Sequence, residues 1–427
     1  MVLASDFISD DKNDFSSVVN GFMPSVAFVP LQQGSDEFVE CTIKENERVK
    51  EGQVIARCAN SYVHSSIPGI VKEICVWQYA NGKQGKTAKI QLDGSFSFTG
   101  RKIERNDWWM YDSTILAQML KNSGVVNTFN GAVSLYEQLK KASQRNDVSI
   151  VVRLFDEDPS RVTESFIAKR YFDEVVEGTS IIAKTINAKS VVFVHDKQCP
   201  LNFEQIQEYF DSSVGVFTVP VNTKHYPYGT MHDIVSAIRK NYKDKFDNLG
   251  VRDFFIDSVT AFHAYRAIVL GIPEIDCYVH VCGECLNVSG VFMVKAGTTL
   301  QMLIDQCGGF KIPPAKIVVN GILTGLSVGS LDVPISKDVK SVAFLPASEV
   351  SVPFTETCVR CGLCRKVCPI HLWPGNIYRV FKSDLNEESV LEASVLCIEC
   401  GLCNAVCPSR ISLYQTMKLL KEKFYEQ

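Results

Sequence analysis

Two copies of one cysteine run near the end of the chain constrain its fold more than any other feature. The first copy, residues 358–369, reads CVRCGLCRKVCP, and the second, residues 397–408, reads CIECGLCNAVCP. Both follow the pattern C-x-x-C-x-x-C-x-x-x-C-P. In this pattern three closely spaced thiolates hold one [4Fe–4S] cluster and the fourth, remote cysteine holds the other cluster. The run therefore predicts a two-cluster, ferredoxin-like helical domain over residues 353–427.

The spacing implies two ligand sets that cross between the runs. One set consists of Cys358, Cys361, Cys364 and Cys407. The other consists of Cys397, Cys400, Cys403 and Cys368. Zinc is the alternative, since C-x-x-C also suits Zn²⁺, but two complete runs that end in Cys-Pro favour clusters. A disulfide framework is typical of secreted chains under about 100 residues, and this chain has 427.

Length and charge exclude several classes of protein. At about 150 residues per domain the chain has room for about three domains. A net charge of −4 gives no reason to expect nucleic acid as a partner. The first residues are polar and acidic and lack the apolar segment of a signal peptide. No apolar stretch approaches the ~18 residues of a membrane span, so we expect a protein that is soluble in itself.

The N-terminal part reads as an arm followed by a small β domain. We expect residues 1–25 to be mobile or loosely attached. Over residues 26–100, short apolar strands follow glycine turns. This part resembles the barrel-sandwich hybrid of biotinyl and lipoyl domains. Residues 63–66 read VHSS near the place where those domains carry their cofactor lysine, so we expect a structural module.

The middle of the chain predicts two further domains. Residues 110–272 alternate helix and strand, which favours an α/β domain with a parallel sheet. Its predicted elements are helices over 113–121 and 165–186 and strands over 148–154, 190–195 and 215–219. Residues 274–347 predict a β-grasp domain. Its predicted elements are a hairpin of 278–281 with 290–294, a helix over 300–307 and a strand over 316–319. In the C-terminal domain we expect helices over 373–396 and 409–424.

The domain order and the motifs together resemble the RnfC family, one of the subunits of the Rnf electron transport complex. Besides the cysteines, the resemblance rests on residues 226–229 (YPYG), 261–267 (AFHAYRA) and 332–337 (DVPISK). It covers residues 25–420 or so. It implies a barrel-sandwich domain, a flavin- and NADH-binding α/β domain shared with the flavoprotein subunit of respiratory complex I, an SLBB-like β-grasp domain and the two-cluster domain.

The chain departs from that family at the nucleotide loop. The family carries G-x-G-G-A-x-F-P-T, where only glycine lets the backbone approach flavin and nicotinamide phosphates. Residues 124–135 read GVVNTFNGAVSL instead, so Gly124 remains and the paired glycines are lost. A remodelled site would use Gly124, Asn130, Gly131 and, on the ribose, Glu157. Phe129 would obstruct a phosphate cradle, so we expect FMN and NADH to bind weakly or not at all.

Three functions remain open. The resemblance implies an electron-transfer subunit of an Rnf-like, membrane-associated oxidoreductase complex. Such a subunit would be cytoplasmic and peripheral on the inner face of the cell membrane. Its partners would be membrane subunits and a ferredoxin or flavoprotein. The second function is a soluble NADH- and FMN-dependent oxidoreductase, against which the glycine-poor loop argues. The third is a structural adaptor stabilised by clusters, which would not need two complete cluster motifs.

Overall fold

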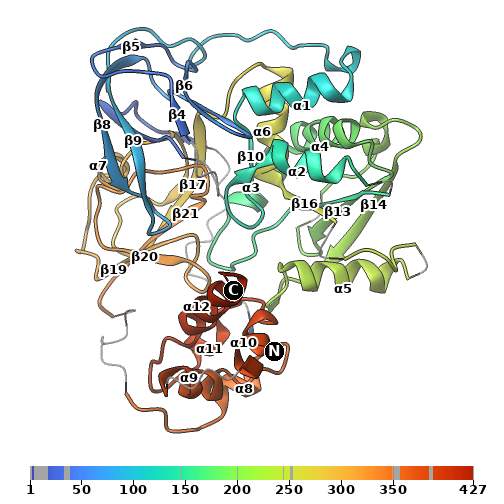
Figure 1. Cartoon of the computed structure of the whole chain (residues 1–427), viewed down its shortest axis with the longest axis vertical. Helices are drawn as coiled ribbons and strands as arrows, with labels where there is room; N and C mark the ends of the chain where they lie inside the picture. The colour runs from blue at the N-terminus through green and yellow to red at the C-terminus, as the bar shows by residue number, and fades with distance from the viewer. Residues whose placement is uncertain are drawn as a thin grey trace.

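The computed structural model describes residues 2–3, 18–32, 39–145, 147–199, 201–243, 245–250, 253–348, 350, 356–383 and 388–426. The chain forms a β-sandwich unit, an α/β unit, a mixed-sheet unit and a small helical unit with the cysteine runs (Figure 1). In Figure 1 the helical unit lies at the lower end, below the three units that contain the sheets. Residues 4–17 of the predicted arm lie outside the described residues.

The first unit is a sandwich of two antiparallel sheets. One sheet has the order β3-β9-β8-β5 and the other β4-β6-β7. Its strands are β3 Val26–Pro30, β4 Val39–Cys41, β5 Arg48–Val49, β6 Val54–Cys58, β7 Tyr62–His64, β8 Gly69–Gln78 and β9 Gln84–Leu92. Alternate residues of β3, Ala27 and Val29, are buried in the core between the sheets. This alternation is what a sheet with one buried face requires, and the predicted sandwich is confirmed.

The α/β unit is built on a parallel sheet with the order β14-β13-β12-β16. Side chains of α1, α2, α4 and α6 pack on one face, and those of α5 pack on the other. The helices are α1 Ser113–Asn122, α2 Leu135–Ala142, α3 Thr163–Arg170, α4 Phe172–Ile186, α5 Met231–Asn241 and α6 Ser258–Val269. The strands of the sheet are β12 Ser149–Arg153, β13 Ser190–Asp196, β14 Gly215–Val221 and β16 Phe254–Asp257. The predicted parallel sheet is confirmed.

The prediction of one long helix over 165–186 is wrong. The segment forms two helices, α3 and α4, that are separated at Tyr171. Tyr171 has φ −127° and ψ 45°, outside the helical region, and its ring stacks on Phe262 of α6 at 4.6 Å between centroids. The packing of this ring accompanies a break that apolar periodicity alone did not reveal.

The third unit is a mixed sheet with the order β2-β18-β17-β21-β19-β20. Its elements are β17 Asp276–Cys282, β18 Gly290–Lys295, α7 Leu300–Gln306, β19 Lys316–Val319, β20 Leu326–Val328 and β21 Ser341–Leu345. β17 and β18 form the predicted hairpin, and α7 packs into the core on this sheet. This strand, strand, helix, strand order agrees with the predicted β-grasp arrangement.

The expectation of a loosely attached N-terminal arm is wrong for its described residues. β2 Val19–Asn20 pairs in parallel with β18 of the mixed sheet. β1 Val2–Leu3 pairs with β15 His225–Tyr226, far along the chain. Backbone hydrogen bonding of this kind uses donors that a short polar segment cannot pair by itself, and the arm sequence shows no strand alternation that would have announced it.

The helical unit follows the sheets. Its helices are α8 Leu363–Val367, α9 Pro374–Lys382, α10 Glu388–Val395, α11 Leu402–Ala405 and α12 Leu413–Glu426. α9, α10 and α12 share a small apolar core that includes Ile377, Val390 and Met417. The predicted helical insert and closing helix are confirmed.

Buried ion pairs join the first three units. Lys295 of β18 lies 2.8 Å from Glu51 of the sandwich and 2.7 Å from Asp276 of β17. Asp276 also pairs with Arg266 of α6. All these side chains are at least largely buried, so each charge depends on its partners in another element.

A second junction centres on Glu274, which is buried between α6 and the mixed sheet. Its carboxylate accepts a hydrogen bond from the Val126 amide at 2.8 Å. It lies 3.8 Å from Lys337 and 4.0 Å from His263. Burial, only partly offset by Lys337, raises the pKa of Glu274 to about 7.

Glu274 makes stability depend on pH, and Glu274→Gln should remove that dependence. The folded protein keeps the carboxyl protonated up to about pH 7, whereas the unfolded chain releases the proton near 4.5. The Glu274 contribution to stability is therefore complete below about pH 4.5 and is lost as the pH rises through about 7. Relative to the variant, the wild type should lose about 2–3 kcal/mol between pH 5 and pH 8. Denaturant unfolding at both pH values measures this. Parallel pH profiles would contradict it, and exposed Glu73→Gln serves as the control.

Candidate functional site

The two cysteine runs fold alike. In each run the residue before the second cysteine and the glycine after it are left-handed: Arg360 and Gly362 in the first, Glu399 and Gly401 in the second. The φ angles of these glycines are 75° and 74°, a conformation that glycine adopts without strain. A short helix then begins, α8 in the first run and α11 in the second. The sequence duplication is thus a duplication of backbone conformation.

The eight cysteines of the runs surround two hollows. The first is lined by Cys358, Cys361, Cys364 and Cys407. The second is lined by Cys368, Cys397, Cys400 and Cys403. Each hollow thus receives three cysteines from one run and the last cysteine of the other, and the structure brings together the residues that the spacing groups.

The two hollows differ in exposure. The first has a volume of about 220 Å³ and includes the exposed Cys361. The second has about 20 Å³ and includes Cys400, which is only 9% exposed. A cluster in the second hollow requires its thiols to move outward, whereas the first already has space.

The second hollow lies against the other units. The Tyr226 hydroxyl of β15 donates a hydrogen bond to the Cys400 carbonyl at 2.8 Å. A Cβ atom at Gly401 would stand 2.2 Å from the Leu323 carbonyl oxygen, so only glycine allows this approach. The Tyr414 hydroxyl donates to the Thr324 carbonyl at 3.2 Å. The second hollow therefore sits where the helical unit meets the α/β and mixed-sheet units.

The donor set of the hollows fits iron–sulfur clusters. Pro374 and Gly375 begin α9 at the first hollow, and a Cβ at Gly375 would lie 3.3 Å from the Cys364 sulfur. The positive end of α9 thereby faces sulfur that carries negative charge when it is a ligand. In the second hollow, burial raises the pKa of Cys400 to about 12. The protein thus does not itself stabilise thiolates there, and bound iron has to balance their charge.

The nucleotide-type loop is occupied by contacts within the protein. β10 Val126–Asn127 pairs with β11 Val133–Ser134 and closes the loop between them. The Thr128 amide donates to the Thr260 hydroxyl at 2.9 Å, and the Phe129 amide donates to the Asn127 side chain at 3.0 Å. Phe129 is buried beneath the guanidinium of Arg153, 4.2 Å from its ring centre. These two amides are therefore not free to bind a phosphate.

Gly124 has a different role from the one expected of a phosphate loop. A Cβ atom there would stand 2.2 Å from the Tyr62 carbonyl oxygen of the sandwich unit. The Gly124 carbonyl accepts a hydrogen bond from Lys337 of the mixed-sheet unit at 2.6 Å. Gly124 thus permits close packing between units.

The acidic segment 156–158 is also used internally. Asp156 accepts hydrogen bonds from the Glu164 and Ser165 amides at the start of α3. Asp158 accepts from the Leu323 and Thr324 amides of the mixed-sheet unit. Glu157 lies 3.3 Å from Arg153 and does not line the pocket beside the loop.

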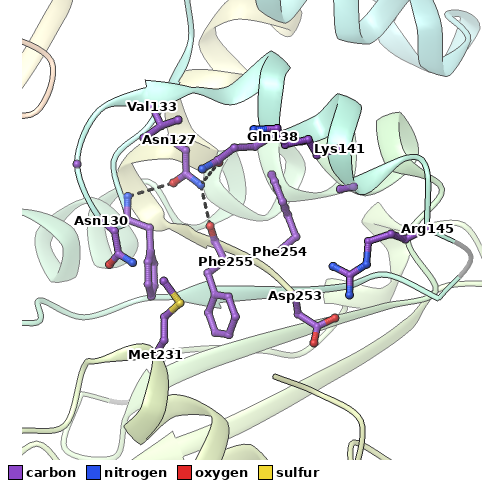
Figure 2. A pocket seen from close by; sticks show the side chains of 13 residues that line it. Asn127, Asn130, Val133, Gln138, Lys141, Arg145, Met231, Asp253, Phe254 and Phe255 are labelled. Atoms are coloured by element: carbon purple, nitrogen blue, oxygen red, sulfur yellow. Dashed lines mark hydrogen bonds between the residues drawn. The ribbon is translucent and has the colours of Figure 1, made fainter. Parts of the chain in front are cut away.

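A pocket of about 260 Å³ does lie beside the loop. Figure 2 shows Asn130 on one side of it, with Gln138, Lys141 and Arg145 of α2 and Phe254 and Asp253 around the rest. Of the four expected cofactor residues, the pocket brings together only Asn130 and Gly131. The dashed bonds of Asn127 in Figure 2 show that its amide joins the loop to α2 and β16.

Sequence reasoning missed a buried charge cluster under the loop. Lys340 lies 2.7 Å from Glu164 and 2.6 Å from Asp257, and its ammonium also donates to the Thr128 carbonyl. Arg153 pairs with Glu164 at 2.8 Å. Burial would raise the pKa of Asp257, but Lys340 and Arg153 hold it well below its usual range. The one available signal was local: Asp257 follows a buried strand and caps α6.

Comparison with known proteins agrees with the two ends of the chain. The family model of the RnfC barrel sandwich hybrid domain matches residues 11–95, and that of a 4Fe-4S dicluster domain matches residues 355–411. The RnfC-type subunit of the proton-translocating ferredoxin:NAD(+) oxidoreductase complex of Clostridium ljungdahlii is 25% identical over 88% of this chain and 82% of its own length. The chain is a homologue of RnfC.

Other RnfC relatives are similarly distant. The corresponding subunit of the ion-translocating oxidoreductase complex of Rhodobacter capsulatus is 24% identical over 85% of this chain and 71% of its own. That of the Na(+)-translocating ferredoxin:NAD(+) oxidoreductase complex of Acetobacterium woodii is 22% identical over 84% and 81%. A solved NAD+-reducing [NiFe]-hydrogenase chain aligns with a TM-score of 0.48 and 11% identity, over 74% of this chain and 62% of that one. Within the described residues, no helix has the length and apolar character to cross a membrane.

Proposed function

We propose that the chain is an electron-transfer subunit of an Rnf-like, membrane-associated oxidoreductase complex and binds two [4Fe–4S] clusters. Cys358, Cys361, Cys364 and Cys407 would hold one cluster. Cys397, Cys400, Cys403 and Cys368 would hold the other. Such clusters supply one-electron storage and transfer. The observation that carries the proposal is the exchange of the last cysteine between the two runs.

The remaining residues position and insulate these ligands. The left-handed glycines turn each run around its hollow, and Gly375 brings the start of α9 to the Cys364 sulfur. The contacts of Tyr226 and Tyr414 fix the second hollow against the sheets. The first hollow stays open to partners, which would be a ferredoxin or flavoprotein and the membrane subunits of the complex.

Iron analysis tests the proposal. Anaerobically reconstituted protein should hold about eight iron atoms per chain, the content of two cubanes, with the broad visible absorption of [4Fe–4S] clusters. About four or fewer iron atoms, together with bound zinc, would refute it.

The second candidate, a soluble NADH- and FMN-dependent oxidoreductase, rests on the pocket beside the loop. We expect FMN and NADH to bind weakly or not at all, because the Thr128 and Phe129 amides are already paired. The loss of two or three charge-assisted hydrogen bonds, at about 1.5–3 kcal/mol each, lowers affinity by several powers of ten. Titration with FMN and NADH, followed by flavin fluorescence and bleaching of the clusters, checks this. Micromolar FMN binding with NADH-driven bleaching would instead establish the second candidate.

The proposed place of the chain is the inner face of the cell membrane, held by other subunits. It should then sediment with membranes at low salt and be released at high salt, because exposed charge pairs are screened. Recovery in the cytosolic fraction alone, without a cross-linked membrane partner, would contradict the assignment to a membrane complex.

A further inference from the structure

The surface around the first hollow combines exposed apolar side chains with a basic rim. Val359 is 65% exposed, Trp373 51% and Leu363 40%. Around them are five exposed basic residues, which we call the basic face: Arg360, Arg365, Lys366, Arg379 and Lys382. Residues 356–383 contain only one acidic residue, Glu356, although the whole chain carries a net charge of −4. Exposed apolar groups framed by charge are typical of interaction sites.

The cations of the basic face have no carboxylate partner among the described residues. Arg365 lies over the ring of Trp373, 4.9 Å from its centre, and Lys382 lies 5.9 Å from that of Tyr378. Arg360, Arg379 and Lys382 also line a further hollow of about 510 Å³ that adjoins Cys358. The positive charge is thus available to an acidic molecule beside the first hollow.

Comparison of the two runs shows that this charge is not part of the cluster-binding pattern. The first run has Arg360, Arg365 and Lys366. The second has Glu399, Asn404 and Ala405 in the same places. Both runs nevertheless share their backbone conformation, with left-handed Arg360 at φ 55° and left-handed Glu399 at φ 58°. The basic residues therefore belong to the outward-facing hollow, and the inward-facing one lacks them.

We propose that the basic face is the docking site of an acidic one-electron carrier protein, which exchanges electrons at the first hollow. This inference rests on the proposed function. In an encounter one electron leaves the reduced centre of the carrier and is taken up at the first hollow, and no bond forms or breaks. Complementary charge speeds such encounters, and Trp373 and the arginines supply the side chains that most often anchor interfaces. α8 and α9 carry most of this surface at the end of the molecule remote from the sheets (Figure 1), where a carrier has access.

The test uses the cluster-loaded full chain and, as probe, an acidic bacterial ferredoxin. The variant combines Arg360→Glu, Lys366→Glu and Arg379→Glu. The first substitution is compatible with the turn, because Glu399 has the same conformation in the second run. The matched control reverses three exposed lysines on the sheet units: Lys72, Lys83 and Lys316. Affinity is measured by biolayer interferometry at 20 and 300 mM salt, and the rate of electron transfer by stopped flow.

We expect the basic-face variant to bind ferredoxin at least about 10-fold more weakly at low salt and to lose most of its salt dependence. Electron transfer from reduced ferredoxin should slow by a similar factor, while the control behaves as wild type. Equal loss in variant and control would show an effect of net charge alone and overturn the proposal. So would unchanged affinity together with lost binding to vesicles of phosphatidylglycerol, which would make the face a membrane contact. Iron content, measured on every sample, separates these outcomes from failure of the proposed function.

Discussion

Cys403→Ser should reduce iron from about eight to about four atoms per chain and loosen the attachment of the helical unit. Cys403 lines the second hollow, whose neighbour Cys400 packs in the apolar cluster of the α/β unit. Cluster binding and local folding are coupled there, because few apolar side chains could replace the cluster. Amide hydrogen exchange should therefore accelerate around Leu323 and Tyr226, which contact this part of the helical unit.

Cys364→Ser is the matched control, since Cys364 has the same place in the first run. It lines the open hollow, so we expect a similar loss of iron without faster exchange at Leu323 and Tyr226. Equal exchange in both variants would contradict a structural role specific to the second cluster. Loss of all iron in both would show that the clusters assemble only together.

Lys340→Met should lower the free energy of unfolding by about 3–5 kcal/mol, the usual effect of breaking a buried ion pair from one side. Glu164 retains Arg153, but Asp257 loses its nearest cation. The low folded pKa of Asp257 contributes stability above its unfolded pKa, and this is lost as the pH falls. In the variant that contribution is diminished, so the difference from wild type should narrow on acidification.

The exposed Lys316→Met, in the same sheet unit, should change stability by less than about 0.5 kcal/mol. Denaturant unfolding of the α/β and mixed-sheet units, followed by tryptophan fluorescence, measures both variants. A Lys340→Met protein as stable as the control would show that the buried cluster tolerates loss of its central cation.

The cysteine runs and the sheets could be predicted because their signals are local. The spacing within each run groups the cysteines by itself, and apolar strands such as β13 are buried on both faces. The charge cluster under the loop could not be predicted in this way. Lys340 is separated by 176 residues from Glu164 and by 83 from Asp257, and no short-range pattern announces such pairs. Gly124 shows the same limit, since its sequence context suggests a phosphate loop whereas its contact is with Tyr62.

The contact of Gly401 with Leu323 also has a consequence for biogenesis. Once the helical unit has closed on the sheets, Cys400 is 9% exposed and its carbonyl is bound by Tyr226. Iron and sulfide should therefore reach this hollow before the units dock, which gives maturation a fixed order. The open hollow, with its exposed Cys361, stays accessible in the finished protein. Its cluster is thus the one that oxidants can damage first and that the assembly machinery can replace without unfolding the chain.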